Sequence, residues 1–259
     1  FLYYICIINK RYTKIKIMTE FTLPTEVIDL PSKGLLYPKD NPLASGKIEI
    51  KYMTAKEEDI LSNISYIQKG IVLDKLFESL IVSKVNYDDL LIGDKNAIMI
   101  AARVLGYGSD YEFEYDGEKQ TVDLSKLDFV KIDEKLWSNG NNFDFTLPST
   151  NNKITFKLLT HGDEQKINKE VNSLKKLKKG SDSTISTRLK YMITSIEGET
   201  ETKKIRDFVD NYLLARDSRA LREFIKTLSP DIDLTFFPDE SESKRPIPIG
   251  LSLFWPDVN

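Results

Sequence analysis

The residues that most often perform chemistry in proteins are scarce in this sequence. Among its 259 residues there is one histidine, His161, and one cysteine, Cys6. A single cysteine can form neither an internal disulfide nor a zinc site made of cysteines. Any histidine-based metal site or catalytic triad would depend on His161 alone. Because His161 lies in the first turn of an expected helix, beside Gly162, we expect its side chain to face solvent.

The clearest group of carboxylates, Glu57-Glu58-Asp59, is explained by helix formation. Thr54 lies three residues before Glu57, and this spacing is a capping box, in which both side chains satisfy backbone N–H groups at a helix start. The helix dipole also favours anions in the first turn. Adjacent helical residues point in different directions, so these carboxylates cannot form an acid–base pair.

Motifs for other kinds of chemistry are missing from the sequence. It contains no EF-hand spacing, no phosphate-binding G-x-x-x-x-G-K-S/T loop, no metal-ligand cluster and no nucleophile elbow. An enzyme needs groups whose protonation or nucleophilicity is tuned within a pocket. We therefore expect a protein that is not an enzyme and that has no catalytic, cofactor-binding or metal-binding residues.

The capping box belongs to a strand–cap–helix unit that occurs twice. Residues 47–59 alternate apolar and polar side chains, as a half-buried strand does, and then become helical after Thr54. Residues 153–165 repeat this pattern, and Thr160 stands where a second cap is expected. The identical pairs are Ile48/Ile154, Lys51/Lys157, Thr54/Thr160 and Glu58/Glu164.

The similarity continues beyond the capped helix. Leu73–Leu80 and Leu189–Ile196 each carry apolar residues at the i, i+3, i+4, i+7 spacing of an amphipathic helix. Asp94 and Asp217 each precede a further apolar stripe, and we expect both to be helix N-caps, a position at which aspartate is preferred. Alternating residues on both sides of Asp116-Gly117 predict a hairpin in the first copy.

These matches predict an α+β fold with two similar lobes that arose by internal duplication. Each lobe is expected to hold a strand, a capped helix, further helices and a hairpin. The tetrapeptide Phe-Thr-Leu-Pro precedes each unit, at residues 21–24 and 145–148. The alternative is two unrelated α+β segments, since one amphipathic helix can imitate another.

The expected boundaries follow from these matches. Residues 1–17 begin without methionine, and we interpret them as upstream sequence before a start at Met18; the rival interpretation is a membrane anchor, although Phe1 to Ile8 is too short to span a bilayer. The expected parts are residues 18–124 for the first lobe, 125–142 for the connection, and 143–259 for the second lobe with an apolar C-terminal strand.

Charge and exposed apolar segments bear on possible partners. The net charge of −3 argues against a dedicated nucleic-acid binder.

Two apolar segments stand out as candidate interface anchors, because aromatic residues contribute much of the binding energy at interfaces. They are Leu35, Leu36 and Tyr37, and Leu253, Phe254 and Trp255. The competing interpretation is that both segments are buried within the chain itself.

Four segments, LPSKGLLYP, KIEIKYMTAKEEDIL, GDKNAIMIAARVLGYG and IGLSLFWPDVN, together resemble the baseplate hub subunits and hub assembly proteins of T-even-like contractile-tailed bacteriophages. The resemblance covers nearly all of Met18 to Asn259. It implies a structural or assembly protein of the virion, assembled in the host cytoplasm and located in the central hub of the tail baseplate. Its partners would be other baseplate proteins, and we expect no cofactor, nucleic acid or membrane. The sequence does not indicate the oligomeric state.

Two alternatives stand beside this expectation. The first is a transient tail-assembly chaperone that is absent from the mature virion. The second is a hub-associated enzyme that degrades the cell wall, which would require a pair of carboxylates in a cleft.

Overall fold

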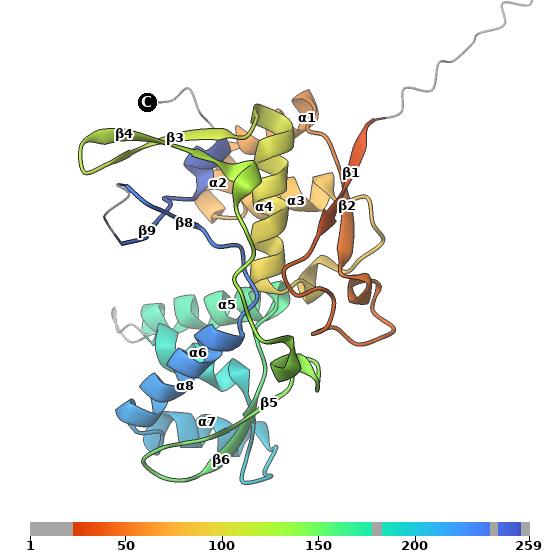
Figure 1. Cartoon of the computed structure of the whole chain (residues 1–259). Coiled ribbons are helices and arrows are strands. Elements are labelled where there is room, and N and C mark those ends of the chain that lie inside the picture. Colours follow the sequence, from red (N-terminus) through yellow and green to blue (C-terminus); the bar gives the residue numbers. More distant parts are fainter. Residues whose placement is uncertain (1–22, 178–182, 239–242, 255–259) are drawn as a thin grey trace, which may run out of the picture.

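The computed structural model describes residues 23–177, 183–238 and 243–254, and these form a mixed α+β structure with small antiparallel sheets (Figure 1). Residues 1–17, interpreted above as upstream sequence, and Trp255 lie outside the described residues.

Residues 25–126 are termed the first half. Their elements are β1 (Thr25–Asp29), η1 (Pro42–Ser45), β2 (Lys47–Lys51), α1 (Ala55–Leu61), α2 (Ile64–Lys69), α3 (Val72–Leu80), η2 (Tyr87–Asp89), α4 (Ile92–Tyr107), β3 (Asp110–Tyr115), β4 (Glu118–Asp123) and η3 (Leu124–Lys126), where η denotes a 3-10 helix. Strands β1 and β2 pair antiparallel, with Ile28 opposite Ile48. The expected hairpin is confirmed: β3 and β4 are joined by Asp116 and Gly117, whose φ angles of 51° and 83° are the positive values that a two-residue hairpin turn requires.

A connection containing η4 (Glu134–Trp137) leads to the second half, residues 143–228. Its elements are β5 (Phe143–Thr146), β6 (Lys153–Phe156), α5 (His161–Leu177), α6 (Thr184–Met192), β7 (Ile193–Ile196), α7 (Thr202–Asn211) and α8 (Ala215–Leu228). The sheet has the order β5-β6-β7, and all its pairs are antiparallel. In Figure 1 its helices lie beside this sheet and below the first half.

Helix α6 is shorter than the sequence pattern predicts. We expected Leu189–Ile196 to be one amphipathic helix, but α6 ends at Met192 and β7 follows directly. Ile193 and Thr194 are β-branched, and such residues favour strands over helices. The first half has a similar arrangement, because Ile81, directly after α3, forms an antiparallel bridge with Ile50 of β2.

Residues 229–254, termed the closing segment, return to the first half. They include β8 (Thr235–Phe236), β9 (Arg245–Pro246) and η5 (Leu251–Phe254). The ring of Phe236 lies 4.9 Å from that of Phe113 in β3, in an edge-to-face arrangement. At the end of the segment, the rings of Phe254 and Phe77 in α3 are 6.3 Å apart. The last described part of the chain therefore packs on the first half.

This placement differs from the expected apolar strand of the second lobe. Residues 251–254 form a 3-10 helix, and only two residues, Arg245 and Pro246, pair with β8. Pro246 and Pro248 have no backbone N–H to donate, so an extended ladder cannot continue through them.

The main hydrophobic core runs through both halves and the connection. Trp137 of η4 is buried, and its indole Nε1–H donates to the carbonyl of Leu228 at the end of α8, at 2.9 Å. A smaller cluster in the second half contains Leu159, Ile167, Val171 and Met192. The two halves therefore share buried side chains and do not form separate cores.

Candidate functional site

The carboxylates after Thr54 act in helix capping. Thr54 is the N-cap residue of α1, and Glu57 accepts its backbone N–H at 2.9 Å and its hydroxyl at 2.6 Å. Glu57 also accepts from Lys51 Nζ at 2.7 Å and from the Ser79 hydroxyl at 2.7 Å. Burial on its own raises the pKa of Glu57, but these hydrogen bonds outweigh it and lower the pKa to about 2. Glu57 is therefore an ionised structural group.

The start of α5 has a similar set of contacts. Asp163 accepts the backbone N–H of Thr160 at 3.3 Å, and its own N–H donates to the Thr160 hydroxyl at 3.3 Å. Lys157 Nζ donates to Asp163 at 2.6 Å. Thr160 thus caps a helix in the same manner as Thr54, with aspartate in place of glutamate.

Asp94 and Asp217 are not helix N-caps, contrary to the prediction. The N-cap residues of α4 and α8 are Leu91 and Leu214, and each aspartate lies three positions later. Both side chains are buried and accept hydrogen bonds from a loop that is distant in the sequence.

The two aspartates hold loops that follow the first strand of each half. Asp94 accepts the backbone N–H of Ser32 at 2.9 Å, the Ser32 hydroxyl at 2.7 Å and the Tyr37 hydroxyl at 2.6 Å. Asp217 accepts the backbone N–H of Ser149 at 2.7 Å and the Thr150 hydroxyl at 3.2 Å. Sequence reasoning missed this pairing, although Leu-Pro-Ser at 30–32 and at 147–149 is a shared signal that could have found it.

The segments predicted as interface anchors are mostly buried within the chain. Leu36 and Tyr37 are buried, while Leu35 remains 44% exposed. Tyr37 is held inside because its hydroxyl donates to Asp94 and accepts the N–H of Leu91. Leu253 and Phe254 are fully buried against the first half, and Trp255 lies outside the described residues. Among the described residues of these two segments, only Leu35 has exposed apolar surface.

His161 is also buried, although we expected it to face solvent. Its Nδ1 lies 3.3 Å from Lys95 Nζ, and its Nε2 lies 2.8 Å from the Gln165 amide nitrogen. The Tyr87 ring contacts it edge-on at a centroid distance of 4.5 Å. Burial, together with the nearby Lys95 charge, lowers the pKa of His161. The expectation was wrong because α5 packs against η2 of the first half, a contact that helical periodicity does not reveal.

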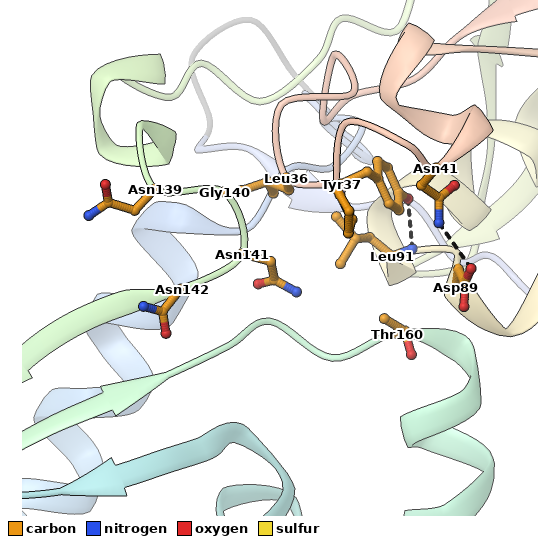
Figure 2. A pocket seen from close by; sticks show the side chains of 11 residues that line it. Leu36, Tyr37, Asn41, Asp89, Leu91, Asn139, Gly140, Asn141, Asn142 and Thr160 are labelled. Atoms are coloured by element: carbon orange, nitrogen blue, oxygen red, sulfur yellow. Dashed lines mark hydrogen bonds between the residues drawn. The ribbon is translucent and has the colours of Figure 1, made fainter. Parts of the chain in front are cut away.

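A hollow of about 450 Å³ lies between the two halves (Figure 2). In Figure 2, Asn141 of the connection lies between the loop that carries Tyr37 and Thr160 before α5. The amide of Asn141 is engaged twice by the backbone of Leu158, at 2.9 and 2.7 Å, and Asn41 donates to Asp89 at 3.0 Å. The Asn141 bonds hold the connection against the second half, and the Asn41–Asp89 bond joins two loops of the first half.

A second hollow, of about 460 Å³, forms a groove between α6 and α8. Apolar residues and a basic rim line it: Ile185, Leu189, Met192 and Ile225, with Arg188, Arg219, Arg222, Glu223 and Lys226. A third hollow, of about 230 Å³, shares Arg188, Met192 and Ile225 with this groove and reaches Leu91–Gly93 of the first half. The two hollows are therefore neighbours that share three lining side chains.

Further features of the described residues bear on the kind of site. Within them, no three His, Cys, Asp or Glu side chains come together in a way that could hold a metal ion. No helix in the same part of the chain is both long and apolar enough to cross a membrane.

Comparison of the sequence and structure with family models, curated proteins and solved structures finds no match.

Proposed function

We propose that this chain is a structural or assembly component of the central hub of a contractile phage tail baseplate and acts through protein–protein contacts. The observation that carries the proposal is the groove between α6 and α8. Its apolar floor includes Ile185, which is 53% exposed, and its rim is basic. Interfaces combine an apolar centre with a polar rim, and arginine is enriched among the residues that dominate binding.

The resemblance of four segments to hub proteins supports the same proposal. Those segments include the loop with Ser32 and Tyr37 and the helix with Asp94, which the structure joins by hydrogen bonds. The resemblance therefore covers residues that depend on one another for the fold.

We also propose that the two halves arose by internal duplication. Three features support this. Each half has a capping box whose acid binds the lysine at the end of the preceding strand. Each has a Leu-Pro-Ser loop that donates to the aspartate of a later helix, and residues directly after the intervening helix pair with the second strand. The Phe-Thr-Leu-Pro tetrapeptides are not part of this match. Pro24 precedes β1, whereas Pro148 follows β5.

The test of the hub proposal is the composition of purified particles of the phage that encodes the chain. We expect quantitative mass spectrometry to find the chain at a fixed copy number per particle. Crosslinking mass spectrometry on intact particles should join it to other baseplate proteins. Presence only in infected-cell lysate would favour the transient chaperone instead. Cell-wall hydrolysis by the purified chain that is lost on a single Asp or Glu substitution would overturn the non-enzymatic role.

A further inference from the structure

The groove between α6 and α8 has a counterpart in the first half, between α3 and α4. Helices α3 and α6 each lead into a residue that pairs with the second strand of its half, β2 or β6. Helices α4 and α8 each carry the aspartate that holds a loop. In the first half, η5 of the closing segment packs against both α3 and α4. Leu253 and Phe254 occupy that space and are fully buried.

The surfaces of the two grooves differ accordingly. Met99 and Ile100 of α4 are buried, at 6% and 5% exposure. The corresponding positions of α8, Arg222 and Glu223, are exposed, and so is Ile185 at the opposite side of the groove. None of the described segments covers the α6–α8 groove in the way that η5 covers its counterpart.

The charged residues at the edge of the α6–α8 groove indicate which kind of segment it could bind. Arg188 pairs with Glu164, and Arg219 pairs with Glu223. Among the described residues, Arg222 and Lys226 take part in no ion pair, and both are exposed. Two unpaired cations beside an apolar floor are complementary to a segment that combines apolar residues with acidic ones.

We propose that the α6–α8 groove binds a short segment of a partner protein, with two large apolar residues in one helical turn and Asp or Glu on either side. This inference rests on the proposed function, because it names the chemistry of the partner. The apolar pair would lie against Ile185, Met192 and Ile225, as Leu253 and Phe254 lie against the first half. The acidic residues would approach Arg222 and Lys226.

A second copy of this chain is a poorer occupant than another protein. Its own apolar end is already buried, and releasing Leu253 and Phe254 would expose two fully buried side chains. Burial of each such side chain stabilises the fold, and its release would lose that contribution. The segment must therefore come from a protein in which it is exposed.

The experiment uses the full chain and a fluorescein-labelled peptide of sequence DESSLFDE, measured by fluorescence anisotropy. We expect saturable binding that weakens when the salt concentration is raised, because exposed charges are screened. Ile185→Glu and the double variant Arg222→Glu/Lys226→Glu should each weaken binding by about tenfold or more. Peptides of sequence KRSSLFKR and DESSSSDE should not bind.

Matched controls separate the groove from general effects of surface charge. Ile64→Glu changes an exposed isoleucine on α2, and Lys56→Glu/Lys69→Glu removes two exposed lysines of the first half. Both controls should change the affinity by less than about twofold. Circular dichroism should show the same helix content for every variant. Absence of binding, or equal binding by groove and control variants, overturns the inference.

This outcome is separate from that of the hub proposal. If the chain has a fixed copy number in purified particles but the peptide does not bind, the groove inference fails and the hub role stands. If the peptide binds in the expected manner but the chain is absent from particles, the hub role fails and the groove inference stands.

Discussion

The two halves place an aspartate at the same point of a helix but surround it differently. Asp94 accepts three hydrogen bonds, one of them from Tyr37, and burial raises its pKa in spite of those bonds. Asp217 is also covered, yet hydrogen bonds from Ser149 and Thr150 outweigh burial and lower its pKa. Both aspartates are fully buried, so the same loop-holding contact is compatible with a raised pKa in one half and a lowered pKa in the other.

The grooves between the helices of the two halves also differ, because one is covered and the other is not. The α3–α4 groove is filled by the closing segment, whereas no described segment fills the α6–α8 groove. The closing segment therefore covers the groove of the first half, while the groove of the second half stays uncovered by the described residues. Substitutions in the two halves should reveal this division.

The largest expected difference concerns the two grooves. Phe254→Ala removes a fully buried ring and should lower the free energy of unfolding by about 4 kcal/mol. Ile185→Ala, on the open groove, should change it by no more than about 0.5 kcal/mol. Urea unfolding followed by circular dichroism measures both. Similar losses for the two variants would mean that the α6–α8 groove is packed in solution.

The second difference concerns the two aspartates. Asp94→Ala leaves the Ser32 N–H, the Ser32 hydroxyl and the Tyr37 hydroxyl without an acceptor, and should cost about 3 kcal/mol. Asp217→Ala removes the acceptor of two donors and should cost about 2 kcal/mol. The measurement is again urea unfolding, at pH 7. A larger loss for Asp217→Ala would contradict the ranking of the two sites.

Local sequence signals predicted several elements correctly. The strand, cap and helix of residues 47–59 and 153–165 and the hairpin at Asp116-Gly117 all depend on residues close together in the chain. Alternation, a capping box and a turn dipeptide each specify backbone geometry within a few residues. For such elements the sequence pattern is sufficient.

Long-range contacts could not be predicted in the same way. Asp94 meets Ser32, which lies 62 residues earlier, and an aspartate in the first turn of a helix can either cap that helix or reach elsewhere. Phe254 contacts Phe77, from which it is separated by most of the chain. An apolar stripe indicates that a face is buried but not what covers it, which is why the candidate anchors at Leu36 and Phe254 are internal.

The third difference concerns the two capping acids. The pKa of Glu57 falls from 4.5 to about 2 on folding, so Glu57 stabilises the fold above pH 4.5 and this contribution is lost as the pH falls towards 2. The shift sets an upper limit of about 3 kcal/mol. Glu57→Gln should cost about 2 kcal/mol at pH 7 and little at pH 2.5.

Asp163→Asn provides the matched variant in the second half. Its partner Lys157 is one-third exposed, whereas Lys51 beside Glu57 is 18% exposed, so the Asp163 pair is more screened by solvent. We expect a cost of about 1 kcal/mol at pH 7. Urea unfolding at pH 7 and at pH 2.5 checks both variants, and a Glu57→Gln cost that does not shrink in acid would contradict the assignment of the lowered pKa.

The smallest expected difference concerns the first residue of each capped helix. This position is Ala55 in α1, where it is exposed, and His161 in α5, where it is buried against Lys95. Because burial and Lys95 lower the pKa of His161, the folded chain binds a proton less readily than the unfolded chain. The contribution of His161 to stability is therefore present above pH of about 6.5 and is lost as the pH falls below it.

His161→Gln should remove that part of the pH dependence. It keeps a polar side chain next to Lys95 and Gln165 but has no proton to gain in this range. We expect the free energy of unfolding of the original chain to fall more steeply between pH 7 and pH 5 than that of the variant. Every other residue is the same in both proteins, so the remaining pH dependence largely cancels in the difference between the two curves. Parallel curves would contradict the lowered pKa of His161. They would mean that the folded and unfolded chains bind a proton at His161 equally readily.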